Sequence, residues 1–429
     1  MTLGKKQLKK ISLFSIVQSL YLSSSLFFSN DLISSASACA FGFLLSVVPI
    51  SMIICVVLLR VLHASPETVS ALISSSPFSS QIISIEDSLP KSLKLVTNFE
   101  VVIIAAVVWM SRRFFSSVIV GLKRIFGKDA KSRPVKNMFL VFTGEALFVI
   151  LFSLIIFIAI SLKTIVLVPR FYGILEPLNN IADLISKTAA GFVPFIILFA
   201  ATAFTYKFGS RTNPSWGISI LSSAGTCASF WILTKVFHLF VNINRYNMVY
   251  GVLSNIIVML MGVFFFFIIF FFFAQWLYVY QFFETLLLCE LYLLPEKQDE
   301  KFFSNIKRFL FINPYFLLKK NSHALNFDDG NFVYRKNSKS EFCFYIASGS
   351  ILLIHKNEGQ VLNQGAFFGE GECLLKKHRQ EDAVSIGKSK VIKIPYSVFQ
   401  KLIEKNPKIG VKALSQIRKY SKRTFSVQE

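Results

Sequence analysis

The sequence predicts an all-α polytopic membrane domain of six transmembrane helices, followed by a small β jelly-roll domain with flanking helices. The first part follows from composition, since 53% of the 429 residues are hydrophobic, 47 are phenylalanine and the mean hydropathy is +0.56. These values lie far from those of average soluble proteins. The second part follows from a change after Pro295, because from residue 301 onward 23 Lys or Arg stand against 10 Asp or Glu.

The membrane spans are predicted from apolar runs of about 20 residues, the length that crosses a bilayer core. The runs that satisfy this rule are 35–62, 95–111, 138–162, 189–207, 216–241 and 250–273. The uncharged run 249–294 is too long for one span. One span followed by an interfacial helix with Trp276, Tyr278, Tyr280 and Glu284 is favoured, and two spans bent at Gly262 are the alternative.

The segment before the first span, residues 11–28, predicts an amphipathic helix at the membrane interface. Its apolar face would carry Leu13, Phe14, Val17, Leu20 and Tyr21, with Ser and Gln opposite. The domains expected from these patterns are a cytoplasmic amino-terminal segment, a membrane domain with its interfacial helix, a charged linker and a carboxy-terminal domain. Their bounds are 1–34, 35–294, 295–301 and 302–429.

The charge distribution predicts the orientation and argues against a nucleic-acid partner. Segment 112–136 carries eight Lys or Arg and one acid, Asp129, so the positive-inside rule places it in the cytoplasm. Six spans then put both termini in the cytoplasm. The Lys and Arg residues that give the net charge of +22 lie between apolar runs and in the last third of the chain. They do not follow one basic face, as a nucleic-acid groove would require. The six cysteines have no CxxC spacing and predict neither a disulfide framework nor a metal site.

Three stretches of the apolar part together resemble the YihY/BrkB family of six-span inner-membrane proteins. They begin NDLISSASACAFGF at Asn30, VVWMSRRFFSS at Val107 and YNMVYGVLSNI at Tyr246. The resemblance covers about residues 20–295 and implies a multi-pass protein of the cell inner membrane with the lipid bilayer as its partner. Members of this family, formerly labelled ribonuclease BN, are often suggested to be transporters or envelope factors.

Four polar or helix-breaking residues inside predicted spans are candidates for a functional site. Pro49 removes a helical hydrogen bond and is expected to kink the first span, which either opens a cavity or is absorbed by neighbouring helices. Glu145, Lys235 and His238 lie within apolar runs, where a charge costs at least about 2.5 kcal/mol at the bilayer centre. A hydrophilic or ion-conducting cleft is one interpretation. A lysine whose side chain reaches the interface is the alternative for Lys235.

The basic part predicts short strands at 342–348, 350–355 and 390–394, and a helix at 397–420. The strings DGNFVYRKNSKSEFCFYIASGS from Asp329 and GAFFGEGECLL from Gly365, with Arg379 after them, resemble the cyclic-nucleotide-binding domain. The resemblance covers about residues 300–420. It implies that Glu370 takes the ribose hydroxyl of a cyclic nucleotide and that Arg379 takes its cyclic phosphate, to which the backbone N–H groups of the Gly369 turn are also suited.

This sequence departs from that family where the phosphate would lie. Glu372 stands where the family has a small apolar residue, and Gln380, Glu381 and Asp382 stand where small residues follow the arginine. Carboxylates there would repel a phosphate. The alternatives are therefore a nucleotide site and a degenerate, structural or partner-docking domain, in which Arg379 pairs with Glu381 or Asp382.

Two other functions receive less support from the sequence. A cyclic-nucleotide-gated channel would need a voltage sensor of regularly spaced Arg or Lys and a TVGYG-like filter, and neither occurs. A ribonuclease would need clustered metal ligands, but the five histidines are scattered. We expect no enzyme activity, no catalytic residue and no cofactor. The favoured function is a transporter or envelope-maintenance factor with a cytoplasmic regulatory-type domain.

The charge asymmetry predicts that reporters fused after residues 80 and 300 lie on opposite sides of the membrane. The measurement is the activity of paired periplasmic and cytoplasmic reporters at both positions. If both fusions report the same side, the predicted orientation or the number of spans is wrong.

Overall fold

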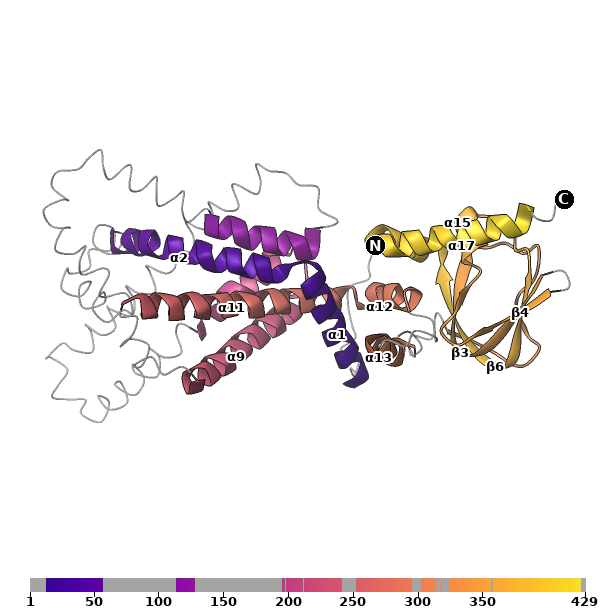
Figure 1. The fold of residues 1–429 in the computed structure, drawn as a ribbon, viewed down its shortest axis with the longest axis horizontal. Helices are drawn as coiled ribbons and strands as arrows, with labels where there is room; N and C mark the ends of the chain where they lie inside the picture. Colours follow the sequence, from indigo (N-terminus) through magenta and orange to yellow (C-terminus); the bar gives the residue numbers. More distant parts are fainter. Residues whose placement is uncertain are drawn as a thin grey trace, which may run out of the picture. The chain divides into compact units, whose positions relative to one another are not determined.

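The computed structural model describes two units of the chain separately, and Figure 1 shows their elements. One unit is Ser24–Tyr278, and the other joins Met1–Ser23 to Val279–Glu429. The described residues are 13–56, 113–127, 195–196, 198–210, 212–240, 252–294, 302–312, 314, 317, 324–355 and 358–425.

The first part of the chain is helical, as predicted. Its long helices are α1 (Leu13–Ser29), α2 (Leu32–Val56), α9 (Trp216–Phe240) and α11 (Val252–Gln281). Among the residues that the structure describes, two stretches, Trp216–Phe237 and Ile257–Gln281, are long and apolar enough to cross a membrane, and the pair α1 and α2, bent by 67°, is a third candidate. The predicted spans at 95–111 and 138–162 lie outside the described residues.

Phenylalanine side chains of α11 form much of the core of the unit Ser24–Tyr278. Phe267, Phe270 and Phe271 are buried at a spacing of three and four residues, which puts them on one helical face. A Cβ atom on Gly121 would lie 2.3 Å from the Phe271 ring, so a glycine lets the helical segment 113–127 approach α11. The phenylalanine run therefore packs protein helices together on one side as well as providing apolar surface.

The uncharged run 249–294, for which the sequence allowed two arrangements, contains one long helix followed by a short one. α11 continues through Gly262 and past the predicted end at residue 273 to Gln281. Trp276, Tyr278 and Tyr280 thus belong to α11 and not to a separate interfacial helix. The short helix α12 is Phe283–Tyr292, and it falls in the unit that contains Val279–Glu429.

The helix α1 has the predicted two faces, but its polar face is the buried one. Gln18 and Ser23 are inaccessible to solvent, and the Gln18 side-chain amide donates to the carbonyl oxygen of Leu310 at 2.7 Å. Ile16 and Val17 are exposed on the opposite side. The buried side of α1 is therefore polar, while its exposed side is apolar and suited to lipid.

The carboxy-terminal unit contains a six-stranded antiparallel sheet with central order β1-β6-β3-β4, in which β2 pairs with β6 and β5 with β3. The strands are β1 (Ala324–Phe327), β2 (Phe332–Tyr334), β3 (Phe342–His355), β4 (Glu358–Asn363), β5 (Phe367–Phe368) and β6 (Asp382–Pro395). Its core is aromatic and aliphatic, with Tyr334, Phe344 and Phe368 stacked near one another. The predicted β domain with flanking helices is therefore present.

The strand boundaries differ from the predicted ones at a bulge. The sequence separates strands 342–348 and 350–355 at Gly349, whereas the structure continues them as the single strand β3. Its pairing with β6 shifts register between Ser348 and Ser350. Gly349 has a φ of +84°, and a Cβ atom there would lie 2.4 Å from the Ser389 hydroxyl oxygen. Only glycine fits this bulge, which bends the strand without ending it.

Helices flank the sheet, and the predicted carboxy-terminal helix is divided in two. These helices are α13 (Phe302–Phe311), α15 (Glu370–Leu375), α16 (Tyr396–Lys405) and α17 (Pro407–Phe425). Asn406 separates α16 from α17 in an extended conformation, because a residue before proline disfavours helical geometry. α17 runs along the sheet next to α15 (Figure 1).

Candidate functional site

The turn predicted to hold a phosphate is formed by Gly369, between β5 and α15. Gly369 has a φ of +70°, which favours glycine. A Cβ atom there would lie 2.3 Å from Nη1 of Arg379. The glycine is therefore needed both for the turn and for the close approach of the arginine. The structure brings together all three residues that the resemblance implied, Gly369, Glu370 and Arg379.

The guanidinium of Arg379 is directed into the protein and not toward solvent, since only 2% of the residue is exposed. Its Nη1 donates to the carbonyl oxygen of Gly369 at 2.7 Å, and its Nη2 donates to the carbonyl oxygen of Phe342. The guanidinium carbon lies 4.2 Å from the ring centre of Tyr334 and 5.7 Å from that of Phe344. These contacts are hydrogen bonds and cation–π interactions with the domain itself.

The carboxylate that pairs with Arg379 is that of Glu372, with 3.6 Å between Nη1 and Oε2. Glu372, a residue of α15, is thus a partner that the sequence analysis did not name for Arg379. Asp382 instead accepts a hydrogen bond from the backbone N–H of Lys336 at 2.6 Å. The α15 turn brings the Glu372 carboxylate toward the guanidinium, which the spacing of the sequence alone does not show.

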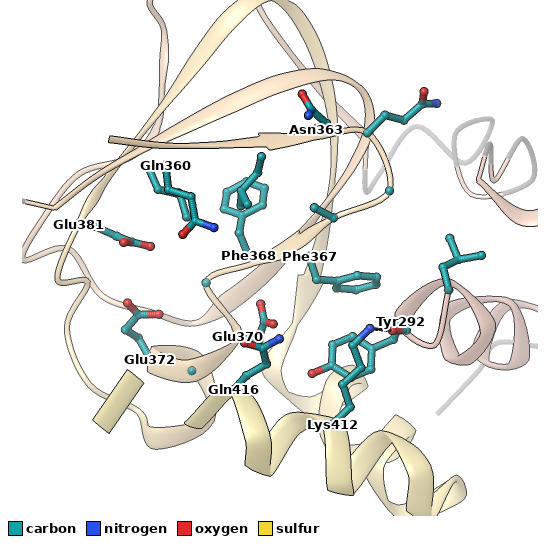
Figure 2. Close-up of a pocket in the computed structure, with 18 of the residues that line it drawn as sticks. Tyr292, Gln360, Asn363, Phe367, Phe368, Glu370, Glu372, Glu381, Lys412 and Gln416 are labelled. Carbon is teal, nitrogen blue, oxygen red and sulfur yellow. Dashed lines mark hydrogen bonds between the residues drawn. The ribbon is translucent and has the colours of Figure 1, made fainter. Parts of the chain in front are cut away.

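A cavity of about 630 Å³ lies beside this pair (Figure 2). Carboxylates of Glu370, Glu372 and Glu381 line it, and Tyr292 of α12 and Lys412 of α17 face them from the other side. The Lys412 ammonium donates to the Tyr292 carbonyl oxygen at 2.6 Å. The further lining residues are Leu294, Arg308, Leu353, His355, Gln360, Leu362, Asn363, Gln364, Gly365, Ala366, Phe367, Phe368, Gly369, Gly371, Gln380 and Gln416.

Two features of the cavity and of the Arg379 environment beside it could not be read from the sequence. Tyr292 stands in an apolar run that resembles a membrane segment, yet its ring packs on Phe367 at 4.9 Å and on Phe399 at 5.2 Å. Tyr334 and Phe344 alternate with other apolar residues like any strand core, and nothing in that alternation indicates that they stack on Arg379. Residues that close a cavity from distant elements become visible only in the fold.

Glu370, the residue that the resemblance assigns to a ribose hydroxyl, is buried at the cavity wall. Burial, with a smaller contribution from the neighbouring Glu372, raises its pKa to about 7, although a backbone hydrogen bond, Lys412 and Arg379 act in the opposite direction. A carboxyl group with this pKa is partly protonated near neutral pH. It can then donate a hydrogen bond as well as accept one.

The membrane candidates do not form one site among the described residues. Lys235 is exposed on α9, with its ammonium 5.8 Å from the ring centre of Trp231. Pro49 lies within α2, which continues to Val56, and the 67° bend falls earlier, between α1 and α2. Glu145 and the side chain of His238 lie outside the described residues. The exposure of Lys235 favours an interfacial lysine over a residue that lines a cleft.

Several hydroxyl groups form hydrogen bonds between helices in the unit Ser24–Tyr278. The Tyr206 hydroxyl bonds Thr226 at 2.7 Å and donates to the Phe270 carbonyl oxygen at 2.9 Å. Thr202 bonds Ser223 in the same region. Because these hydroxyls find partners in the protein, their arrangement supports close helix packing and not a water-filled path. Among the described residues no cluster of His, Cys, Asp or Glu could hold a metal ion.

Comparisons with known proteins agree with the two parts of the chain. Residues 25–285 match the family model described as virulence factor BrkB. Residues 324–406 match the model described as cyclic nucleotide-binding domain. No curated protein sequence matches this one.

Solved structures resemble the carboxy-terminal part. The catabolite activator protein of Thermus thermophilus is 19% identical, with 24% of this chain and 52% of that chain covered and a TM-score of 0.21. This chain thus spans about half of that protein. The regulatory domain of Toxoplasma gondii PKA, solved with cAMP, is 18% identical, with 22% and 38% of the two chains covered and a TM-score of 0.20.

The raised pKa of Glu370 predicts a pH-dependent effect of Glu370→Gln. The folded-state pKa of about 7 lies above the ordinary value of 4.5, so the wild-type domain loses stability as the pH rises between these values. Relative to wild type, Glu370→Gln should therefore gain roughly 1 to 3 kcal/mol between pH 5 and pH 8. Thermal unfolding of the full-length protein in detergent across this range measures the difference. A constant difference would show that Glu370 has an ordinary pKa.

Proposed function

The chain belongs to the virulence factor BrkB family, and from that premise we propose that it is a non-enzymatic transporter or envelope-maintenance factor of the cell inner membrane. Both termini lie in the cytoplasm in this proposal. The chain also carries a domain of the cyclic-nucleotide-binding class. We propose that this domain is a regulatory-type module that docks a partner or stabilises the protein, and that it does not bind cyclic nucleotides.

The observation that carries the second proposal is the environment of Arg379. Its guanidinium is buried, donates to two backbone carbonyl oxygens and pairs with Glu372. A cyclic phosphate would have to displace the Glu372 carboxylate, which is itself 5% exposed. Displacing a buried partner costs free energy that a new ion pair must first offset. Both terminal nitrogens of the arginine on which phosphate recognition would depend therefore already have partners in the protein, while its buried Nε has none.

A nucleotide sensor is the second candidate, and the cavity supports it. The volume of about 630 Å³ is in the range of small-molecule sites. Glu370 and Arg379 also stand near one another, as the family pattern requires. The carboxylates of Glu370, Glu372 and Glu381 around this cavity disfavour an anionic ligand. For this reason we favour the module that does not bind nucleotides.

We expect the wild-type full-length protein in detergent to bind cyclic AMP and cyclic GMP more weakly than about 1 mM, or not at all. The physical reason is the competition of the Glu372 carboxylate for the same guanidinium. Isothermal titration calorimetry with each nucleotide measures the affinity. Saturable micromolar binding would establish the sensor and overturn the proposal.

For the membrane part, we expect Glu145→Gln to lose the function that is lost when the gene is deleted. The abundance of the protein should stay unchanged. A carboxylate within a span is costly to insert and is seldom kept without a use. Lys235→Met is the matched control, because Lys235 is exposed beside Trp231 and should tolerate the loss of its charge. Complementation of the deletion strain, with immunoblots for abundance, gives the comparison. Full function of Glu145→Gln would argue against a polar site at that depth.

A further inference from the structure

The ion pair of Arg379 and Glu372 is a buried pair, which makes it different from most ion pairs at protein surfaces. The side chains are 2% and 6% exposed. A buried guanidinium without a counter-charge would cost several kcal/mol, so some anion has to accompany it in the folded domain. In this chain the anion is supplied by the protein itself.

The backbone around Glu372 is fixed, so its carboxylate is not on a loose loop. The Ser340 hydroxyl donates to the Glu372 carbonyl oxygen at 2.9 Å, and the Lys377 N–H donates to the same oxygen at 3.0 Å. These bonds connect α15 to the segments before β3 and after α15. Gly371 and Glu372 also line the cavity, so a ligand in the cavity would meet this carboxylate.

We propose that Glu372 is an internal anion for Arg379: its carboxylate occupies the position that a ligand phosphate would otherwise take and keeps phosphate-bearing ligands out of the cavity. Carboxylate and phosphate both offer oxygen acceptors to a guanidinium, so one can replace the other. This inference rests on the proposed absence of nucleotide binding and assigns that absence to one side chain. Glu372 is thus the residue that determines ligand specificity here.

The geometry also explains why one substitution could reverse the exclusion. The separation of 3.6 Å between Arg379 Nη1 and Glu372 Oε2 is longer than a direct charged hydrogen bond, whereas Nη1 holds the Gly369 carbonyl at 2.7 Å. Truncating Glu372 would remove the charge and open space beside Nη1. The bonds of Arg379 to the Gly369 and Phe342 carbonyl oxygens would keep the guanidinium in place.

The test compares Glu372→Ala with wild type in the full-length protein in detergent, with cyclic AMP and inorganic phosphate as separate calorimetric probes. We expect Glu372→Ala to bind at least one probe about tenfold more tightly than wild type or better, because a like charge about 4 Å away opposes an anion by more than this factor. Binding of cyclic AMP alone would identify a nucleotide as the excluded ligand. Binding of both probes would indicate a general anion site.

Three further variants make the result decisive. Glu404→Ala removes an equal charge from the exposed surface of α16 and should leave binding unchanged. Glu372→Gln keeps the side-chain shape without the charge and should also gain affinity, so it replaces Glu372→Ala if the alanine variant does not fold. Adding Arg379→Gln to either variant should abolish the gain.

The outcomes separate this inference from the proposed function. A folded Glu372→Ala or Glu372→Gln protein that binds neither probe, beside a wild type that also binds neither, would overturn the inference and leave the proposed function intact. Tight binding by the wild type would overturn both. A gain that persists without Arg379 would also contradict the inference, since the internal anion would not then act through the guanidinium.

Discussion

The buried guanidinium of Arg379 is the interaction on which the organisation of the carboxy-terminal domain depends. It joins the β3 strand through the Phe342 carbonyl, the glycine turn through Gly369 and the α15 helix through Glu372. Such a charge is stable in a protein interior only when hydrogen bonds and a counter-charge replace its hydration. The same arrangement that stabilises the fold thus also removes the arginine from the ligands that enter the cavity.

In the helical part of the chain, neutral polar groups are also buried together with hydrogen-bond partners. Tyr206 on one helix reaches Thr226 on α9 and the Phe270 carbonyl on α11, so its hydroxyl is paired within the protein. The polar face of α1 is buried in the same way, with Gln18 bound to the Leu310 carbonyl. Apolar side chains are left on the outside. In both cases a paired polar group stabilises packing inside the protein.

Much of the architecture was predictable because it depends on local patterns. Apolar length predicted α9 and α11, and turn residues with alternating apolar residues predicted the β domain that holds Gly369 and Arg379. The sequence left more open where one pattern is compatible with two environments. The residues of α12 are as apolar as a membrane segment, yet Tyr292 packs on Phe399 of the β domain. Likewise, the sequence placed three carboxylates near Arg379, but the choice of Glu372 depends on how α15 turns.

The most direct test of this account is the coupling free energy between Arg379 and Glu372, from a double-mutant cycle with Arg379→Gln and Glu372→Gln. Unfolding of the carboxy-terminal domain in the full-length protein gives the four stabilities. The account predicts a favourable coupling of about 1 to 3 kcal/mol, as for buried neighbours in one network. A coupling of zero would mean that the two side chains act independently, and Glu372 would not be the internal anion of Arg379.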